Sequence, residues 1–202
     1  KSELVKMIMK SVARRRRKDA ESEIEPLCEK WIDENGSLPL HIAVANRVPT
    51  DLVLVLLEAY PDAVRIADKH GRLPLHYSMS HRYPNCDLQA YWPESKSVRD
   101  RTGCLPLHYA CRFGVNWSSI QHMCLPDDSS ATECGDNKCE SPLHKACIGG
   151  HIDLIKQLLE AGIKSAAKTN IDGMSPLLLL AQADGKSDLP FNERRNNLAF
   201  VE

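Results

Sequence analysis

The chain has 202 residues, 43% hydrophobic and 26% charged, a composition typical of a folded protein of one or two domains and not of a disordered one. Its 26 basic and 27 acidic side chains give a formal net charge of -1, so the chain lacks the overall positive charge that favours nucleic-acid binding. No apolar run approaches the roughly 20 residues that a membrane-spanning helix needs. We therefore expect neither direct nucleic-acid binding nor a membrane span.

The first 32 residues predict a helical extension or cap. Apolar residues recur at helical spacing at its start, and a basic run, Arg14-Arg15-Arg16-Arg17-Lys18, follows them. This run is either a nuclear-import signal or phosphate-binding patch, or a solvated helix end whose cations favour the carboxyl end of the helix dipole. The later apolar positions Ile24, Leu27 and Trp31 predict a helix that covers the domain that follows. Because the sequence begins with Lys1 and not with Met, we interpret it as a segment of a longer protein.

A short motif dominates the rest of the chain. Leu38-Pro39-Leu40-His41-Ile42-Ala43 returns in related form at Leu73, Leu105, Ser141 and Ser175, at spacings of 35, 32, 36 and 34 residues. Such a period indicates stacked structural repeats. The motif histidine is present in four copies and is replaced by leucine in the fifth; these residues are His41, His76, His108, His144 and Leu178.

Turn chemistry precedes every copy of the motif. An Asp or Asn stands five positions before each copy, and a Gly or, once, a Cys stands two positions before it. The acid or amide can cap the local backbone, and glycine adopts a positive φ without strain. The motif proline suits the first position of a helix. Each unit is therefore predicted to be a turn followed by a short helix; the turn residues are Asp33 and Gly36, Asp68 and Gly71, Asp100 and Gly103, Asp136 and Cys139, and Asn170 and Gly173.

A second helix is expected in each unit. It is clearest in residues 50–59 and in residues 150–162, where Ile152, Ile155, Leu158 and Leu159 are predicted to form one buried face and Gly162 to end the helix. Prolines at 84 and 93 interrupt the corresponding segment of the second unit. A polar insertion, residues 125–134, follows that of the third unit, so these two units are predicted to be the least regular.

The pattern Asp-x-x-Gly-x-Thr-Pro-Leu-His-x-Ala with a period near 33 resembles the ankyrin repeat. The resemblance covers residues 33–184, with units starting near 33, 68, 100, 136 and 170. It implies an all-α solenoid of paired helices with projecting β-hairpin loops and a protein-binding role. We expect residues 1–32 to be the N-terminal extension or cap, and residues 185–202 to be a partial cap or a disordered tail.

Three units depart from the family's helix cap. Leu38, Leu73 and Leu105 replace the threonine, a loss of about 1 kcal/mol each that interrepeat burial of leucine can partly offset. Cys139 replaces the turn glycine of the fourth unit, and its hairpin is therefore less certain.

The eight cysteines are too few and too scattered for a disulfide scaffold. Several lie in helical segments, for example Cys111 and Cys147. We therefore expect free, buried thiols in a reducing compartment, and so an intracellular protein, cytoplasmic or nuclear.

Neither a catalytic site, a cofactor nor a metal is predicted. A residue that recurs at the same place in four of the five units is expected to have a repeated structural role, and the resemblance implies that the histidines tie neighbouring hairpins together. Zinc binding by Cys134, Cys139, His144 and Cys147 remains an alternative, although four residues between the two leading cysteines is at the edge of known spacings.

The resemblance places the partner-binding surface on the concave face and the hairpin tips. Tyrosine and arginine are frequent energetic hot spots in interfaces, and Tyr77 and Tyr109 hold equivalent positions in adjacent units. The basic side chains around them suggest an acidic partner segment, while packing of the tyrosines between helices is the alternative. The predicted binding residues are Lys69, His70, Arg72, Tyr77, Arg101, Tyr109, Arg112, Phe113, Lys138 and Lys145.

We predict a monomeric, non-catalytic scaffold that binds another protein and has no small-molecule substrate. Two alternatives stay open, namely the interaction arm of a larger enzyme (a kinase, ubiquitin ligase or acyltransferase) and a nuclear regulatory protein.

Overall fold

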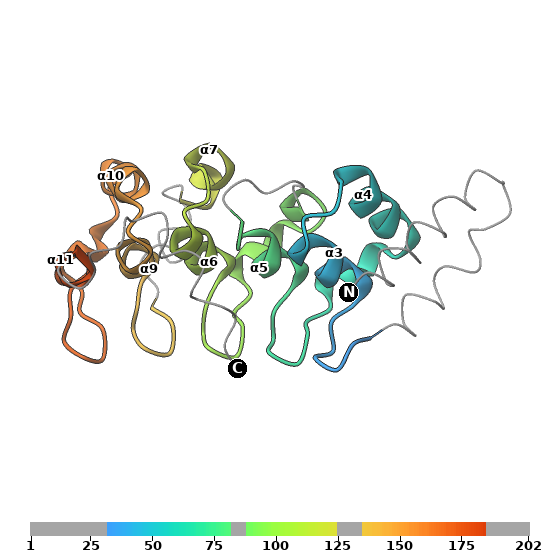
Figure 1. The fold of residues 1–202 in the computed structure, drawn as a ribbon, viewed down its shortest axis with the longest axis horizontal. Coiled ribbons are helices and arrows are strands. Elements are labelled where there is room, and N and C mark those ends of the chain that lie inside the picture. Colours follow the sequence, from blue (N-terminus) through green and yellow to red (C-terminus); the bar gives the residue numbers. More distant parts are fainter. Residues whose placement is uncertain (1–31, 82–87, 125–134, 185–202) are drawn as a thin grey trace, which may run out of the picture.

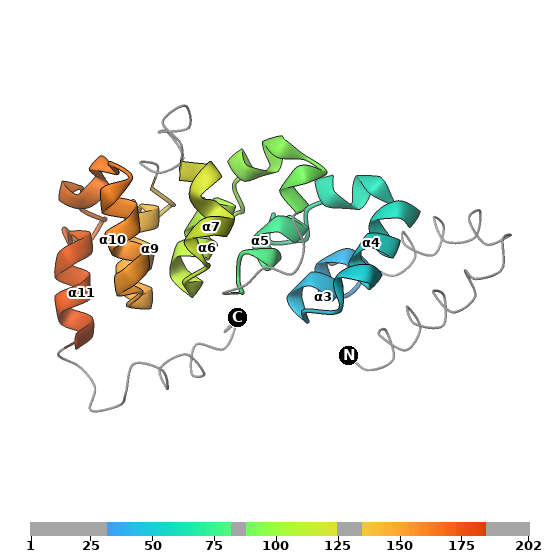
Figure 2. The same ribbon diagram turned by 90° about the horizontal axis from the view of Figure 1, so that it is seen from above.

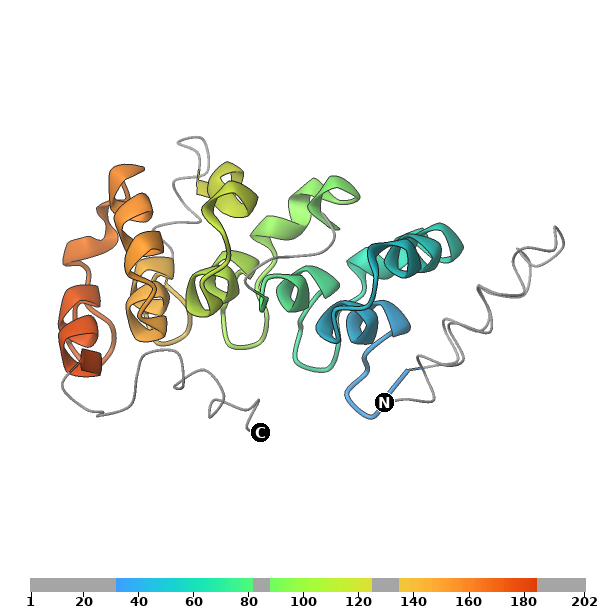
Figure 3. The same ribbon diagram turned by 45° about the horizontal axis from the view of Figure 1, so that its top comes forward.

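The computed structural model describes residues 32–81, 88–124 and 135–184. These residues form a row of short inner helices, with outer helices on one side of the row and projecting loops on the other (Figure 1). A tilted view separates the two tiers of helices (Figure 3). The predicted N-terminal extension with its basic run, the polar insertion 125–134 and the C-terminal tail lie outside the described residues.

Every inner helix begins at the motif proline, as predicted. Proline has no amide hydrogen to lose at this position, and its fixed φ suits the first turn. Seen from above, the inner helices follow one another along the row in chain order (Figure 2). They are α3 (Pro39–Ala45), α5 (Pro74–Ser78), α6 (Pro106–Phe113), α9 (Pro142–Gly149) and α11 (Pro176–Asp184).

The outer tier varies from unit to unit. It is regular in the first and fourth units, with α4 (Thr50–Ala59) followed by the 3₁₀ helix η1 (Pro61–Arg65), and α10 (Ile152–Glu160) followed by η6 (Lys164–Ala167). In the third unit, the residues described before the gap at 125–134 form α7 (Trp117–Ile120) and η4 (Gln121–Cys124). In the described part of the second unit the outer tier is reduced to η2 (Leu88–Ala90) and η3 (Pro93–Ser97). The predicted irregularity of these two units is confirmed.

The buried face of α10 differs from the one predicted. Ile152 and Leu159 are 43% and 40% exposed, whereas Leu154, Ile155 and Leu158 are buried. At about 100° per residue the buried stripe is centred near Leu158, and the two exposed side chains point a quarter to a third of a turn away from it. The prediction that Ile152 and Leu159 lie on the buried face was therefore wrong, and it omitted Leu154, which is buried.

Leucine at the helix cap is buried, and the backbone replaces the missing side-chain acceptor. Leu38, Leu73 and Leu105 all lie in the core and make no side-chain cap. In the second and third units the amide of the motif histidine donates instead to the carbonyl of the cap leucine, at 3.0 and 2.9 Å. The loss expected from the absent threonine is thus partly offset by burial and by a tighter first turn.

The motif histidines connect one unit to the next, as the resemblance implied. Nδ1 of His41 and of His76 accepts the amide hydrogen of the cap leucine three residues earlier, at 3.1 and 3.0 Å. On the other edge of the ring, Nε2 of His41 faces the carbonyl of Arg72 at 3.1 Å. Nε2 of His76 likewise faces the carbonyl of Cys104 at 3.3 Å.

His144 repeats this arrangement, with Nδ1 accepting from the amide of Ser141 and Nε2 facing the carbonyl of Met174 at 3.2 Å. One nitrogen must accept and the other donate, so the rings are neutral with the hydrogen on Nε2. Burial lowers the pKa of His41 and His144, and it lowers the pKa of His76 to about 4.

Four cysteines pack in the interior as free thiols, and one does not. Cys104, Cys111, Cys124 and Cys147 are buried, as predicted, and desolvation raises the pKa of each thiol above its ordinary value. Cys139 is exposed, because it occupies a projecting loop and not a helix face. The expectation of burial was therefore wrong for Cys139; Cys28, Cys86 and Cys134 lie outside the described residues.

Candidate functional site

The candidate surface consists of the projecting loops and the inner helices from which they emerge (Figure 1). Each loop is closed by the side chain of its first residue. In the second unit, Oδ1 of Asp68 accepts the amide hydrogens of His70 and Arg72, both at 2.8 Å. The same pair of bonds recurs in the other four units, at 2.7–3.0 Å. The capping role predicted for these acids and for Asn170 is confirmed.

The fourth loop has the same turn although it lacks glycine. The amide of Cys139 donates to the carbonyl of Asp136 at 2.9 Å, and the equivalent bond from Gly103 to Asp100 is 3.0 Å. Cys139 has a φ of 58°, in the left-handed region where the other units place glycine. This backbone conformation is strained for a residue with a Cβ atom. The turn of the fourth unit, which the sequence left uncertain, is therefore regular in its hydrogen bonding but strained at Cys139.

Backbone hydrogen bonds join each loop tip to the next. The amide of Lys69 donates to the carbonyl of Asn35 at 2.8 Å, and that of Arg101 to the carbonyl of His70 at 2.9 Å. The third and fourth links run from the amides of Asn137 and Ile171 to the carbonyls of Thr102 and Lys138, both at 3.0 Å. The tips therefore form one continuous edge, and their relative positions are set within the protein.

The two predicted tyrosines are half-buried and bonded to the loop of their own unit. The hydroxyl groups of Tyr77 and Tyr109 donate to Oδ2 of Asp68 and Asp100, each over 2.6 Å. Each tyrosine thereby attaches the loop to the inner helix nine residues later. Burial, together with the adjacent aspartate, raises the pKa of Tyr77 to about 12 and raises that of Tyr109 further.

Each of these rings also packs against the previous unit. Tyr77 meets His41 edge-on with 5.8 Å between ring centroids, and Tyr109 meets His76 in the same way at 5.6 Å. Such edge-to-face pairs stabilise the packing beyond the area that they bury. Much of each tyrosine side chain therefore packs between helices, as the alternative interpretation proposed. Both side chains still keep part of their surface exposed.

Arg72 connects the second and third units. Its guanidinium lies over the ring of Tyr109, 5.9 Å from the centroid, and its Nε is 3.9 Å from Oδ2 of the fully buried Asp100. The positive charge that was predicted to face a partner is therefore directed largely to an internal carboxylate and an internal aromatic ring.

Lys145 has the same place in the fourth unit that the tyrosines have in the second and third. Its Nζ lies 2.6 Å from Oδ2 of Asp136 and 2.6 Å from Oε2 of Glu140, and its side chain is only 12% exposed. Although burial lowers the pKa of Lys145, the two carboxylates raise it above its ordinary value. Lys145 is therefore charged and internally paired.

The remaining predicted residues are more accessible. Lys69, His70, Arg101 and Lys138 are exposed on the three central tips. Arg112 and Phe113 are half-buried in the last turn of α6, so they lie on an inner helix and not on a loop tip.

Sequence reasoning missed the acidic partners of this surface. It treated Asp68, Asp100 and Asp136 only as turn residues and did not single out Glu140. The signal was present, because a tyrosine or lysine follows the turn aspartate by nine residues in three successive units. It also missed His81 and His151, whose Nε2 atoms contact the carbonyls of Ala45 and Arg112 at 3.1 and 2.9 Å and so join successive inner helices.

Among residues 32–81, 88–124 and 135–184, no group of three or more His, Cys, Asp or Glu side chains could hold a metal ion. Of the proposed zinc ligands, His144 and Cys147 are buried in α9, Cys139 is in the exposed loop, and Cys134 lies outside the described residues.

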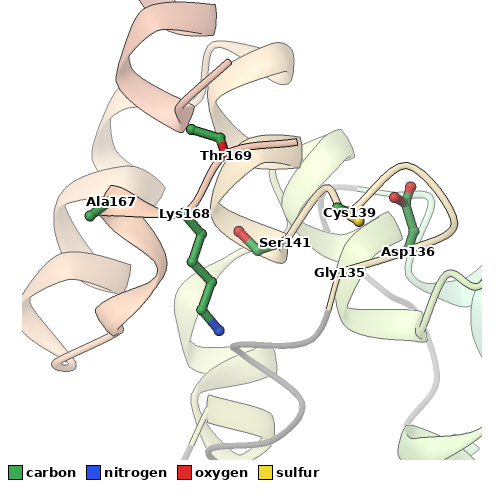
Figure 4. A pocket seen from close by; sticks show the side chains of 7 residues that line it. All are labelled: Gly135, Asp136, Cys139, Ser141, Ala167, Lys168 and Thr169. Atoms are coloured by element: carbon green, nitrogen blue, oxygen red, sulfur yellow. The ribbon is translucent and has the colours of Figure 1, made fainter. Parts of the chain in front are cut away.

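A shallow, open depression of about 440 Å³ lies between the fourth loop and the segment that leads to the fifth (Figure 4). Asp136, Cys139 and Lys168 are among its lining residues. The carboxylate of Asp136 is already paired with Lys145 and not directed to a ligand.

Comparison with known proteins agrees with this geometry. Residues 107–189 match the family model for ankyrin repeats, in three copies. None of the curated proteins matches the chain. In the described part of the chain, no helix has the length and apolar character required to cross a membrane. The proline-initiated inner helices, the capped loops and the matching family model together show that the chain contains ankyrin repeats.

Proposed function

We propose that this chain is a non-catalytic module that binds another protein through its loop tips and the adjoining surface of its inner helices. Ankyrin repeats are generally protein–protein interaction modules, and domains built from them are typically non-catalytic. The observation that carries the proposal is the continuous edge of tips, in which a backbone hydrogen bond joins each tip to the next. A surface that is ordered before binding loses little conformational entropy when a partner docks.

The predicted residues divide into two roles in this proposal. Tyr77, Tyr109, Arg72 and Lys145 hold the loops against the inner helices and against neighbouring units, and offer a partner only their remaining exposed edges. Lys69, His70, Arg101 and Lys138 contact the partner directly on the tips. Arg112 and Phe113 supply a cation and an aromatic ring, which are frequent hot-spot groups, at the end of α6.

An affinity capture tests the proposal. The full chain is used as bait in a cell lysate, beside the variant Arg112→Ala/Phe113→Ala, and retained proteins are quantified by mass spectrometry. The matched control is Lys156→Ala/Leu159→Ala, which removes an exposed cation and an exposed apolar side chain from the outer helix α10. Circular dichroism melting verifies that all three baits are folded.

We expect a partner that the native chain and the α10 control retain equally. The variant at the end of α6 should retain it at least about tenfold less, since truncating a hot-spot residue costs about 2 kcal/mol or more. Equal retention by all baits would show that the inner-helix surface is not the site, and loss in the α10 control alone would place binding on the outer tier.

A further inference from the structure

Among the five described loop tips, only the three central ones have exposed basic side chains. Lys69, Arg101 and Lys138 are exposed there, one on each tip, whereas Glu34 and Asp172 occupy the first and last tips. We name these three residues the basic strip. Acidic tips at either side would repel a negatively charged ligand, so the strip has defined ends.

The charge of the basic strip is not cancelled by the loops' own aspartates. Asp68, Asp100 and Asp136 direct Oδ1 into their turns and Oδ2 toward Tyr77, Tyr109 and Lys145, respectively. Among the described residues, no carboxylate forms an ion pair with Arg101 or Lys138. The Nζ of Lys69 donates to the backbone carbonyl of Glu34 at 2.6 Å, which leaves its charge unpaired by any described acid.

The spacing of the strip sets the form of its ligand. Each tip directly precedes an inner helix, and the inner helices pack side by side. Packed helices lie about 8–10 Å apart, and we take this as the distance between neighbouring tips. An extended chain advances about 3.3 Å per residue, so one step from tip to tip corresponds to about three residues. Two steps join Lys69 to Lys138, and a ligand that contacts all three cations therefore needs about seven residues.

From this spacing and charge, we propose that the basic strip binds an extended acidic segment of a partner protein whose carboxylates recur at every third residue. This inference rests on the proposed function and specifies the partner of the same surface. A peptide fits better than a single-stranded nucleic acid, because nucleic-acid sites combine cations with aromatic rings on which bases stack. Here the rings of Tyr77 and Tyr109 are half-buried and packed edge-on against histidines of the previous unit.

A random dodecamer peptide display library, selected on the full chain, provides the first test. The proposal predicts enrichment of sequences with Asp or Glu at positions i, i+3 and i+6. The variant Arg101→Glu/Lys138→Glu reverses two of the three cations of the strip and should fail to retain these peptides. The control Lys156→Glu/Lys164→Glu makes the same change of net charge at exposed lysines of α10 and η6, and should retain them.

Synthetic peptides give the quantitative form of the test. An enriched peptide is compared with an isomer in which the same acids are adjacent, by isothermal titration of the full chain. The isomer can pair with only one cation of the strip at a time, so it should bind about fivefold more weakly, and the difference should shrink at high salt.

Three outcomes would overturn the proposal. One is enrichment of peptides without the acidic period, another is equal binding of the two isomers, and the third is a selection that enriches no peptide. A labelled single-stranded RNA that binds as tightly as the best peptide, and is lost in the strip variant, would also overturn it. If enriched peptides ignore the strip but are lost in Arg112→Ala/Phe113→Ala, the proposed function stands and only this inference fails.

Discussion

The hydroxyl of Tyr109 donates a 2.6 Å hydrogen bond to Oδ2 of Asp100, the residue that opens the loop of the same unit. Oδ1 of that carboxylate accepts the amides of Thr102 and Cys104 and so closes the loop. One fully buried aspartate therefore fixes the loop internally and attaches it to the inner helix. Although burial raises the pKa of Asp100, its hydrogen bonds, that from Tyr109 foremost, hold the pKa below its ordinary value.

Removing this hydroxyl should destabilise the protein. Tyr109→Phe is expected to lower the free energy of unfolding by about 2 kcal/mol, because a hydrogen bond to a buried charged group is lost while the charge remains. Urea unfolding followed by circular dichroism measures the change. Tyr91→Phe is the control, since Tyr91 is 48% exposed, and an equal effect of the two changes would contradict the assigned role.

Substitutions of Lys145 can test whether it has the same role as the two tyrosines. Lys145→Met leaves Asp136 and Glu140 without their cation and should cost about 3 kcal/mol. Lys145→Tyr places a hydroxyl where the second and third units have one, and should recover part of that loss by bonding Asp136. Chemical denaturation of both variants decides the question. If Lys145→Tyr were no more stable than Lys145→Met, the shared position would have no shared role.

The strained turn of the fourth unit predicts a stabilising substitution. Cys139→Gly should raise the free energy of unfolding by about 1 kcal/mol, because glycine adopts the φ of 58° without a Cβ clash. The reverse experiment is Gly103→Ala, whose Cβ would approach the amide nitrogen of Asn137 to 2.8 Å at a φ of +78°. Thermal melts should move in opposite directions, and a lower melting temperature for Cys139→Gly would refute the strain.

From the neutral, buried state of His76 we predict how the stability of the protein depends on pH. The pKa of His76 falls from 6.5 to about 4 on folding, so between these values the unfolded chain binds more protons than the folded one. The stability due to the neutral ring is fully present above pH 6.5 and is lost as the pH falls toward 4. The loss amounts to about 3 kcal/mol for this residue. His41 and His144 shift in the same direction and add to the effect.

Urea unfolding from pH 7 to pH 4 measures this dependence. His76→Gln, which cannot titrate, should show a smaller slope of unfolding free energy against pH than the native chain. His70→Gln, at an exposed loop tip, is the control and should keep the native slope. An unchanged slope in His76→Gln would contradict the neutral, buried state of this ring.

The elements that depend on local chemistry could be predicted from the sequence. Proline at the first helical position and Asp with Gly in a turn act through their own backbone, so the inner helices and loops begin where the motif places them. The interrupted outer tier of the second unit followed from its prolines in the same way.

The side-chain partners depend on contacts that periodicity does not specify. Nothing in the sequence around Arg72 shows that its charge turns toward Asp100 in the next unit, because the direction of a loop side chain depends on the neighbouring loop. The face of α10 was misassigned because its apolar residues fit two overlapping stripes, and only packing against α9 distinguishes them. The sequence could therefore not distinguish the cations that are paired internally from those that are exposed on the tips, and the structure was needed to do so.

Hydrogen–deuterium exchange of the full chain, with and without the captured partner, tests the proposed binding surface directly. We expect slower exchange at the tips around Lys69, Arg101 and Lys138 and at the end of α6, with α4 and α10 unchanged. Protection confined to the outer helices, with the tips exchanging as in the free protein, would contradict the claim that this edge is the binding surface.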